Sequence, residues 1–378
     1  MIYFLLLHLV IFFYLLIRLV LPSGFSWKAK TGLALLLLVT SQHYLVRFAF
    51  NSLSTPEIPG FLIAFEGWCF ATVIFLFVLV LVRDFILLLK RFLFGKGSGN
   101  RLRFRSEKRR SAEYASGRRK AMLALAVMAA APAAYGVREG TRLPRVREWS
   151  ESFPNLPKGL DGLSIAHITD LHISRLFGPD WLAELVAKVN SLEPDLILFT
   201  GDMADGSTGL RGDDVEALGL LRARLGVFGC VGNHEYYSGY RFWMSRLEGL
   251  GMTMLENSHR AMGVNGAGLV IAGVTDPVAG DFGLPLPDSA AALRDAPESS
   301  FKILLDHRPT AFERNAASGA NLQLSGHTHG GHIVGMDRQV ERFDNGYVYG
   351  WYGQAEARTV HSSGAGRGSG LPVRQRAI

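Results

Sequence analysis

The chain has 378 residues, of which 40 are Lys or Arg and 33 are Asp or Glu, so its formal net charge is +7. Residues 1–140 hold 18 basic and 6 acidic residues, whereas the remaining 238 residues hold 22 basic and 27 acidic ones. Because the basic excess lies beside long apolar runs, it is typical of a membrane protein and argues against a nucleic-acid partner. The two cysteines, Cys69 and Cys230, fall in different parts and do not indicate a redox compartment.

Four apolar runs occupy the first part of the chain, over residues 2–21, 33–50, 61–82 and 121–135. A helix needs about 20 apolar residues to cross roughly 30 Å of hydrocarbon. The first and third runs meet this length. The second meets it if Arg47 and its polar neighbours face partners or the interface, and the fourth needs its flanking residues. We therefore predict a transmembrane α-helical region of about four helices over residues 1–140.

The charges of the loops predict how these helices are oriented. The stretch 96–120 carries ten Lys or Arg residues, whereas 51–60 carries none. Positively charged loops stay in the cytoplasm. We therefore expect 96–120 to be a cytoplasmic loop in a bacterial inner or plasma membrane, with everything after the fourth helix on the periplasmic or extracellular side. A nucleic-acid-binding patch is the alternative explanation of this stretch.

Arg118 and Arg119 precede the Ala-rich fourth run, and together they resemble a twin-arginine export signal. The cytoplasmic flank of a membrane helix explains the same residues. Both interpretations place the rest of the chain across the membrane. Whether the fourth helix crosses or is cleaved after export stays open at this point.

From about residue 160, short apolar runs alternate with amphipathic stretches, which is the pattern of βαβ units in an α/β layered fold. We predict strands over 163–168, 195–200, 226–231, 252–255, 269–274, 301–305 and 322–324, then late antiparallel strands over 347–352 and 358–362. Helices are predicted over 181–190, 215–225 and 240–250. Residues 141–159 are expected to be a linker between the membrane region and a soluble domain over 160–378.

Polar motifs stand directly after five of the predicted strands. They are Asp170 with His172, Gly201-Asp202, Gly232-Asn233-His234, His307, and His327 with His329. In open α/β sheets, ligand sites form beyond the carboxyl ends of the strands. We therefore predict that these side chains meet in one site.

Imidazole, carboxylate and amide donors suit divalent metals that act on phosphate, and this set is enough to hold two such ions with one bridging aspartate. Two metals about 3.5–4 Å apart hold a hydroxide between them and clamp the phosphoryl oxygens, and the pKa of the water falls to about 7. No serine or cysteine nucleophile is needed. The motifs thus predict hydrolysis of a phosphate ester by attack of a metal-bridging hydroxide.

Residues 150–373, with these motifs in order, resemble the calcineurin-like metallophosphoesterases, most of all the membrane-attached bacterial branch and the transmembrane proteins with a metallophosphoesterase domain. The resemblance implies mixed sheets flanked by helices and two divalent ions, which would be Mn, Zn or Fe. It implies that one metal is bound by Asp170, His172 and His329. It implies that Asp202 bridges to a second metal, which is bound by Asn233, His307 and His327.

The resemblance also assigns catalysis to His234, together with Asn233. His234 would contact the phosphate and protonate the leaving group, and Glu235 would act at most indirectly. Two features depart from the family. Gln usually stands where His332 is, and relatives usually continue into one more strand beyond Ile378, so changed surroundings of the site and an incomplete sheet edge are expected.

The leading hypothesis is a membrane-anchored phosphoesterase that acts on phosphodiesters in the first place, with a lipid or nucleotide substrate. One alternative is a pyrophosphatase for nucleotide- or lipid-linked diphosphates, such as a UDP-sugar lipid, because the same metal pair attacks either bond. Another is a non-catalytic metal-binding sensor, against which the complete ligand set argues. The aromatic run over 235–243 fits helix packing or a substrate shelf. The substrate, the metals and the oligomeric state do not follow from the sequence.

Overall fold

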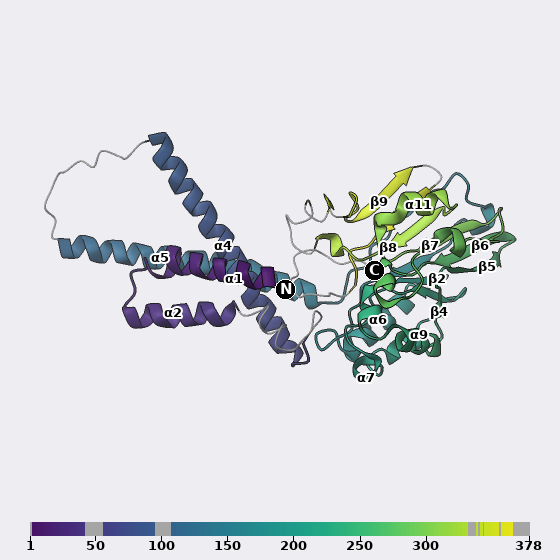
Figure 1. Ribbon diagram of the computed structural model, residues 1–378, viewed down its shortest axis with the longest axis horizontal. Coiled ribbons are helices and arrows are strands. Elements are labelled where there is room, and N and C mark those ends of the chain that lie inside the picture. The colour runs from purple at the N-terminus through teal and green to yellow at the C-terminus, as the bar shows by residue number, and fades with distance from the viewer. Residues whose placement is uncertain are drawn as a thin grey trace. The chain divides into compact units, whose positions relative to one another are not determined.

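The computed structural model describes residues 2–41, 56–94, 107–331, 338, 341–342, 344–354 and 357–365. It consists of two compact units, residues 1–138 and 139–378, each of which is considered by itself (Figure 1). The end of the second predicted membrane run, His332 and the C-terminal residues from 366 onward lie outside the described residues.

The first unit is helical. Its described helices are α1 (Ile2–Leu15), which continues as the π-helical turn η1 (Leu16–Val20), α2 (Trp27–Thr40), α4 (Gly60–Phe94) and α5 (Glu107–Thr141). In the described part of the chain, Gly60–Phe94 and Glu113–Thr141 are long and apolar enough to cross a membrane, by length and composition, and Leu6–Val20 is a shorter apolar helix. The Ala-rich run 121–135 therefore lies inside a helix that is longer than its apolar pattern indicates.

Polar side chains join the helices of this unit. Asp84 on α4 accepts hydrogen bonds from the hydroxyl of Tyr14 at 2.8 Å, from Nε of Arg18 at 2.5 Å and from Nε and Nη2 of Arg83 at 2.9 and 2.7 Å. The indole nitrogen of Trp68 donates to the carbonyl of Ala130 on α5 at 3.0 Å. These bonds pair the polar groups of otherwise apolar helices. A polar group without a hydrogen-bond partner is costly in lipid.

Two sheets form the second unit. The first contains β1 (Ile165–Ile168), β2 (Leu196–Thr200), β3 (Val227–Cys230) and β4 (Thr253–Met254), in that order and all parallel. The second has the order β5 (Ser258–Val264), β6 (Ala267–Gly273), β7 (Phe301–Leu305), β8 (Leu322–Ser325), β10 (Ala357–His361), β9 (Gly350–Gln354). Its inner strands are parallel and its two edge strands are antiparallel to their neighbours.

Alternation along the strands explains how the layers pack. On β2, Leu196 and Leu198 enter the apolar cluster between the two sheets, whereas Ile197 and Phe199 enter the cluster under the helices. Successive strand residues point to opposite faces, so a strand that is apolar throughout is buried on both. The result is a sandwich of two sheets with helices outside, as the sequence predicts (Figure 1).

Helices α6 (Pro179–Asn190) and α9 (Tyr240–Gly249) cover the first sheet, while α10 (Ser289–Ala292) and α11 (Phe312–Ala317) belong to the second. The α6 helix begins with Pro179 in its first turn, where the missing N–H costs nothing. Its residues Leu182, Leu185 and Val189 recur at helical spacing and are buried. Short helical turns complete the unit: η2 (Lys158–Leu160), α7 (Thr208–Arg211), η3 (Glu216–Leu220), α8 (Asn233–Tyr237), η4 (Pro277–Phe282), η5 (Pro309–Ala311) and η6 (His329–Gly331).

The predicted helix over 215–225 is wrong. The segment forms only the 3₁₀ turn η3, and Leu221 after it is extended. The side chain of Asn190 binds the carbonyl of Leu220 at 2.8 Å and the N–H of Arg222 at 2.8 Å, so it takes up backbone groups that a longer helix would need. Strand β5 was not predicted. Apolar and polar residues do not alternate regularly along this edge strand, and only Val264 in it is buried.

Candidate metal centre

The predicted site residues lie in loops and short helical turns that follow the carboxyl ends of β1, β2, β3, β7 and β8. These strands are parallel within each sheet, so their ends open on the same edge of the sandwich. The structure brings the predicted residues of these loops together there. They are Asp170, His172, Asp202, Asn233, His234, His307, His327 and His329.

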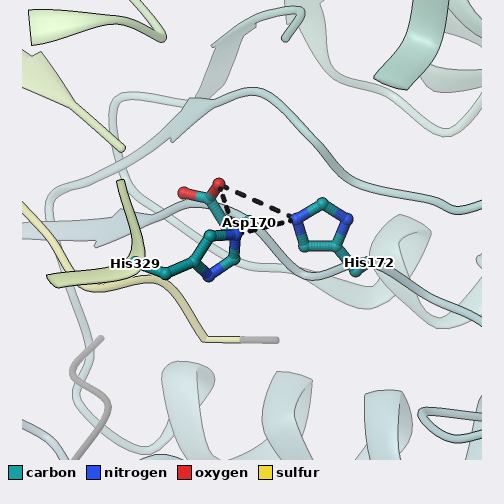
Figure 2. A group of neighbouring side chains, drawn as sticks. All are labelled: Asp170, His172 and His329. Atoms are coloured by element: carbon teal, nitrogen blue, oxygen red, sulfur yellow. Dashed lines mark hydrogen bonds and ion pairs between the residues drawn. The ribbon is translucent and has the colours of Figure 1, made fainter. Parts of the chain in front are cut away.

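One group of side chains comes from the loops after β1 and β8. Nε2 of His172 and Nε2 of His329 face each other at 3.2 Å. The Oδ1 oxygen of Asp170 lies 3.8 Å from the first of these nitrogens and 3.4 Å from the second. Figure 2 shows both rings directed at this oxygen, and all three residues are buried. Three donor atoms thus converge on one point.

A second group joins Asp202 to the loops after β7 and β8. Nε2 of His307 lies 3.3 Å from Oδ2 of Asp202 and 3.2 Å from Nδ1 of His327. The same Oδ2 atom lies 3.7 Å from Nε2 of His172, which belongs to the first group. Asp202 therefore stands between the two groups.

The backbone around the site is strained. Five of the gathered residues adopt a left-handed conformation, with φ between 46° and 75°; they are Asp170, His172, Asp202, His327 and His329. For residues other than glycine this conformation costs roughly 1–2 kcal/mol each. Such strain persists where the surrounding structure fixes it, and it clusters at functional sites. Here it turns the side chains of consecutive loops toward a common centre.

Two glycines allow the loops to approach one another. A Cβ at Gly232 would lie 2.2 Å from Oδ1 of Asp202, and a Cβ at Gly326 would lie 2.2 Å from Oδ2 of Asp170. Real Cβ atoms do not come so close, so each carboxylate packs against a backbone that has no side chain.

A third group includes Asp205, which the sequence analysis did not single out. Its Oδ1 atom lies 2.9 Å from Nδ1 of His172 and 2.7 Å from Nδ1 of His234. Asp205 is 1% exposed and follows Asp202 by three residues, in the loop after β2. That spacing places it in the same loop and is the only signal in the sequence that could have drawn attention to it.

Glu235 holds two of these loops together. Its carboxylate accepts hydrogen bonds from the backbone N–H groups of Asp202 at 3.0 Å, Met203 at 2.8 Å and Gly232 at 2.8 Å. The side chain is fully buried. The loop after β2 is thereby tied to the loop after β3, and the position of Asp202 depends on Glu235.

The site stabilises positive charge. Burial alone would raise the pKa of Asp202, but the neighbouring imidazoles, His307 above all, hold it well below its usual range. Burial likewise disfavours a charged His307, and the carboxylate of Asp202 outweighs it and raises that pKa to about 10. Burial and the charges of His307 and Arg308 lower the pKa of His327 to about 3, so this ring is neutral at pH 7. Carboxylates that favour protonated rings this strongly also favour metal cations.

The donor set fits divalent metals. Pairs of ring nitrogens face each other at 3.2 Å in both groups, which without a cation requires one of the two facing nitrogens to carry a proton. Among the described residues, the buried Oδ1 atom of Asn233 has no hydrogen-bond partner. A buried acceptor is normally paired. Imidazole, carboxylate and amide oxygen are ligands that Mn, Zn and Fe accept.

Known proteins are similar to this chain in sequence. The profile of the calcineurin-like phosphoesterases matches residues 163–331. A transmembrane protein with a metallophosphoesterase domain from Danio rerio is 31% identical over 294 residues, which cover 75% of this chain and 67% of that protein. The chain belongs to the calcineurin-like phosphoesterase family. The resemblance noted from the motifs is thereby confirmed, and so is the predicted fold class.

Other members of the family are similarly distant from this calcineurin-like phosphoesterase. An uncharacterized metallophosphoesterase of Campylobacter jejuni is 32% identical over 232 residues, 61% of this chain and 60% of its own. The chain thus spans about three fifths to two thirds of the length of these two relatives. The solved structure of Haemophilus influenzae NAD nucleotidase covers 54% of this chain and 45% of its own at 18% identity and a TM-score of 0.38, a likeness too distant to carry an argument about substrates.

Proposed function

We propose that this protein is a membrane-anchored phosphoesterase with two divalent metal ions, and that it hydrolyses phosphate esters, phosphodiesters among them. The observation that carries the proposal is the position of Asp202, whose Oδ2 atom faces His172 of one group and His307 of the other. A carboxylate in this position is suited to bridge the two metals.

The two groups support one set of ligands for each metal. Asp170, His172 and His329 would hold one ion, and His307, His327 and Asn233 the other, with Asp202 between them. Two bound divalent ions supply an activated water for attack on phosphorus and neutralise charge on the phosphoryl oxygens. The open Oδ1 atom of Asn233 supports its inclusion in the second set.

His234 is proposed as the general acid. Nδ1 of its ring is fixed by Asp205, and its Nε2 atom lies 3.9 Å from Oδ2 of Asp202, so that the ring faces the centre. Burial lowers its pKa, but Asp202 and Asp205 outweigh this effect and raise it. The rise favours the imidazolium form, whose Nε2 proton would be available to the oxygen of the departing group. One fifth of the side chain is exposed, so part of the ring is open to a substrate.

We further propose that the enzyme is an integral protein of a bacterial inner or plasma membrane, with its catalytic part on the periplasmic or extracellular side. The two long apolar helices and the basic stretch 96–120 support this placement. The bilayer and a phosphate ester, from a lipid or a nucleotide, are the expected partners, and nucleic acid is not.

The test uses the full chain in detergent, loaded with Mn²⁺, and bis(4-nitrophenyl) phosphate as substrate. We expect hydrolysis by the wild type and its loss in Asp202→Asn, together with a fall in the number of metal ions per chain. Asp213→Asn, an exposed aspartate in the same unit, is the matched control. No hydrolysis of aryl mono- or diesters by the wild type, or an Asp202→Asn protein with two metals and near-normal turnover, would refute the proposal.

A further inference from the structure

Arg308 directly follows the buried His307, and its guanidinium group is held in one orientation. Nε donates to Oδ2 of Asp276 at 2.8 Å, and Nη2 donates to Oδ1 of the same residue at 3.1 Å. Asp276 is 1% exposed, while the side chain of Arg308 is 27% exposed. Among the described residues, Nη1 of Arg308 makes no hydrogen bond, so one edge of a pre-oriented cation is open.

This cation lies on the side of the site that carries His234. Asp276 accepts a hydrogen bond from Val278 N at 2.9 Å and begins the η4 turn, which ends at Phe282. The ring of Phe282 lies 6.4 Å from that of Tyr237, which in turn lies 5.9 Å from that of His234. Arg308, through Asp276, therefore belongs to the same wall of the site as these rings.

The charge of Arg308 acts across this wall. Burial raises the pKa of Tyr237, and Arg308 opposes that rise. Burial also raises the pKa of Asp344, which Arg308 again opposes. Tyr237 is 54% exposed and Phe282 is 49% exposed, so an apolar surface of two rings lies open beside the cation. Of the aromatic run over 235–243, Trp243 is fully buried and serves packing, which leaves Tyr237 as the exposed part nearest to His234.

A fixed guanidinium group beside a phosphate site has a specific chemical use. Arginine presents a rigid fork of donors that matches phosphate oxygens, and charge-assisted bonds of this kind are stronger than neutral ones. Asp276 neutralises and orients the cation but occupies only part of the fork. An ion pair with one buried partner is by itself weak evidence of a stabilising role, so the pair is compatible with a role in binding.

Resting on the proposed function, we propose that Arg308 is a specificity-determining residue that binds a second phosphate of the substrate, on the leaving-group side of the scissile one. The preferred substrate class is then a diphosphate ester, whose ring or apolar part packs on Tyr237 and Phe282. Hydrolysis adds the oxygen of water to one phosphorus and breaks the bridging P–O bond. The water protons go to the product oxygens or to solvent, so both products leave as phosphate monoesters.

The test compares two substrates that differ by one phosphate, the 4-nitrophenyl esters of AMP and of ADP, with products separated by chromatography. The full chain in detergent is loaded with Mn²⁺, and kcat/KM is measured for the wild type and for Arg308→Gln. We expect Arg308→Gln to lower kcat/KM for the ADP ester about 10–100-fold, chiefly through KM, and to change it less than about threefold for the AMP ester. Arg314→Gln, an exposed arginine six residues on, is the control and should change neither.

A second variant guards against loss of the fold, because Arg308→Gln leaves Asp276 without its partner. Arg308→Lys keeps a cation for Asp276 but cannot bind it and a phosphate with one fork, so it should fold normally and still discriminate less between the two esters. Thermal melting identifies which variants are folded. Equal losses on both esters, or no loss on either, would overturn the role of Arg308.

The wild type separates this inference from the proposed function. Hydrolysis of neither ester would overturn the proposed function, and the inference with it. Hydrolysis of the AMP ester with a kcat/KM equal to or above that of the ADP ester would overturn the substrate class and leave the phosphoesterase proposal standing.

Discussion

A single oxygen of Asp205 binds the Nδ1 atoms of both His172 and His234, at 2.9 and 2.7 Å. Burial opposes the charge of Asp205, but the two imidazoles outweigh it and hold its pKa below the usual range. The carboxylate therefore accepts from two Nδ1–H groups, and the Nε2 atoms of both rings point into the site. One side chain thus orients a proposed metal ligand and the proposed general acid together.

Asp205→Asn should leave the fold intact and lower kcat/KM about 10–100-fold, which is the usual cost of changing a residue that orients a ligand. The amide keeps the shape of the side chain and removes its charge, so the pKa of His234 should fall. The basic limb of the pH profile of kcat should then move to lower pH. Steady-state rates from pH 5 to 10 give both effects.

Asp213→Asn is again the matched control for this change. An Asp205→Asn enzyme with the wild-type pH profile, whatever its rate, would show that Asp205 does not set the protonation of His234. A purely structural defect would lower the rate at every pH by the same factor.

His234→Ala should separate the chemistry from metal binding. The expected metal content is that of the wild type, because His234 is outside both proposed ligand sets. General acid catalysis contributes about 10²–10⁴-fold, so turnover of alkyl phosphodiesters, whose leaving groups need a proton, should fall by this factor. The loss should shrink for nitrophenyl esters, whose leaving groups need little protonation. Equal losses for alkyl and nitrophenyl esters would indicate that His234 positions the phosphate instead.

Much of the site could be predicted from one sequence because its ligands follow short apolar runs directly. Strand β2 is buried on both faces, and β1 and β3 are buried or half-buried along their length, so all three stand out as short, largely apolar runs and the residues after them mark one sheet edge. Chemically distinctive residues in those positions are visible without any structure. The same holds for His307 and His327, which follow β7 and β8.

The parts that could not be predicted depend on contacts between segments far apart in the sequence. Glu235 works by accepting three backbone N–H groups from two loops, which no side-chain pattern reveals. Little in the sequence distinguishes Asp205 from the other aspartates, and only the structure shows the two imidazoles that it binds. The helix predicted over 215–225 stops after a short turn because the side chain of Asn190, which lies 25 or more residues earlier, binds its backbone groups.

Metal binding should release protons and strengthen as the pH rises. Without metal, the pKa of His307 is raised to about 10, so this ring is protonated in the folded chain at pH 7, and the pKa of His172 is also raised well above its usual value. A metal binds only the neutral ring, so each ring proton competes with the metal.

Calorimetric titration of Mn²⁺ in two buffers of different ionisation enthalpy should show at least one proton released per chain at pH 7. The apparent Kd should fall between pH 6 and 9. A Kd that is independent of pH over this range would contradict the charges assigned to these rings.

The last prediction concerns the side of the membrane on which the catalytic unit lies. Two described helices are long and apolar enough to cross, and the ten basic residues of 96–120, which precede the apolar part of the second helix, favour the cytoplasm. The helix after them runs to Thr141 and should bring the chain to the outside. An alkaline phosphatase fused after Gly140 should therefore be active, and one fused at 105 should be inactive. A fluorescent protein that is dark when it is exported by the general secretory route reports the cytoplasmic side. It should give the opposite pattern at the same two positions. An inactive phosphatase at 140 together with an active one near Ser54 would show that the helix ending at Thr141 does not cross, and that the substrates of this enzyme are cytosolic.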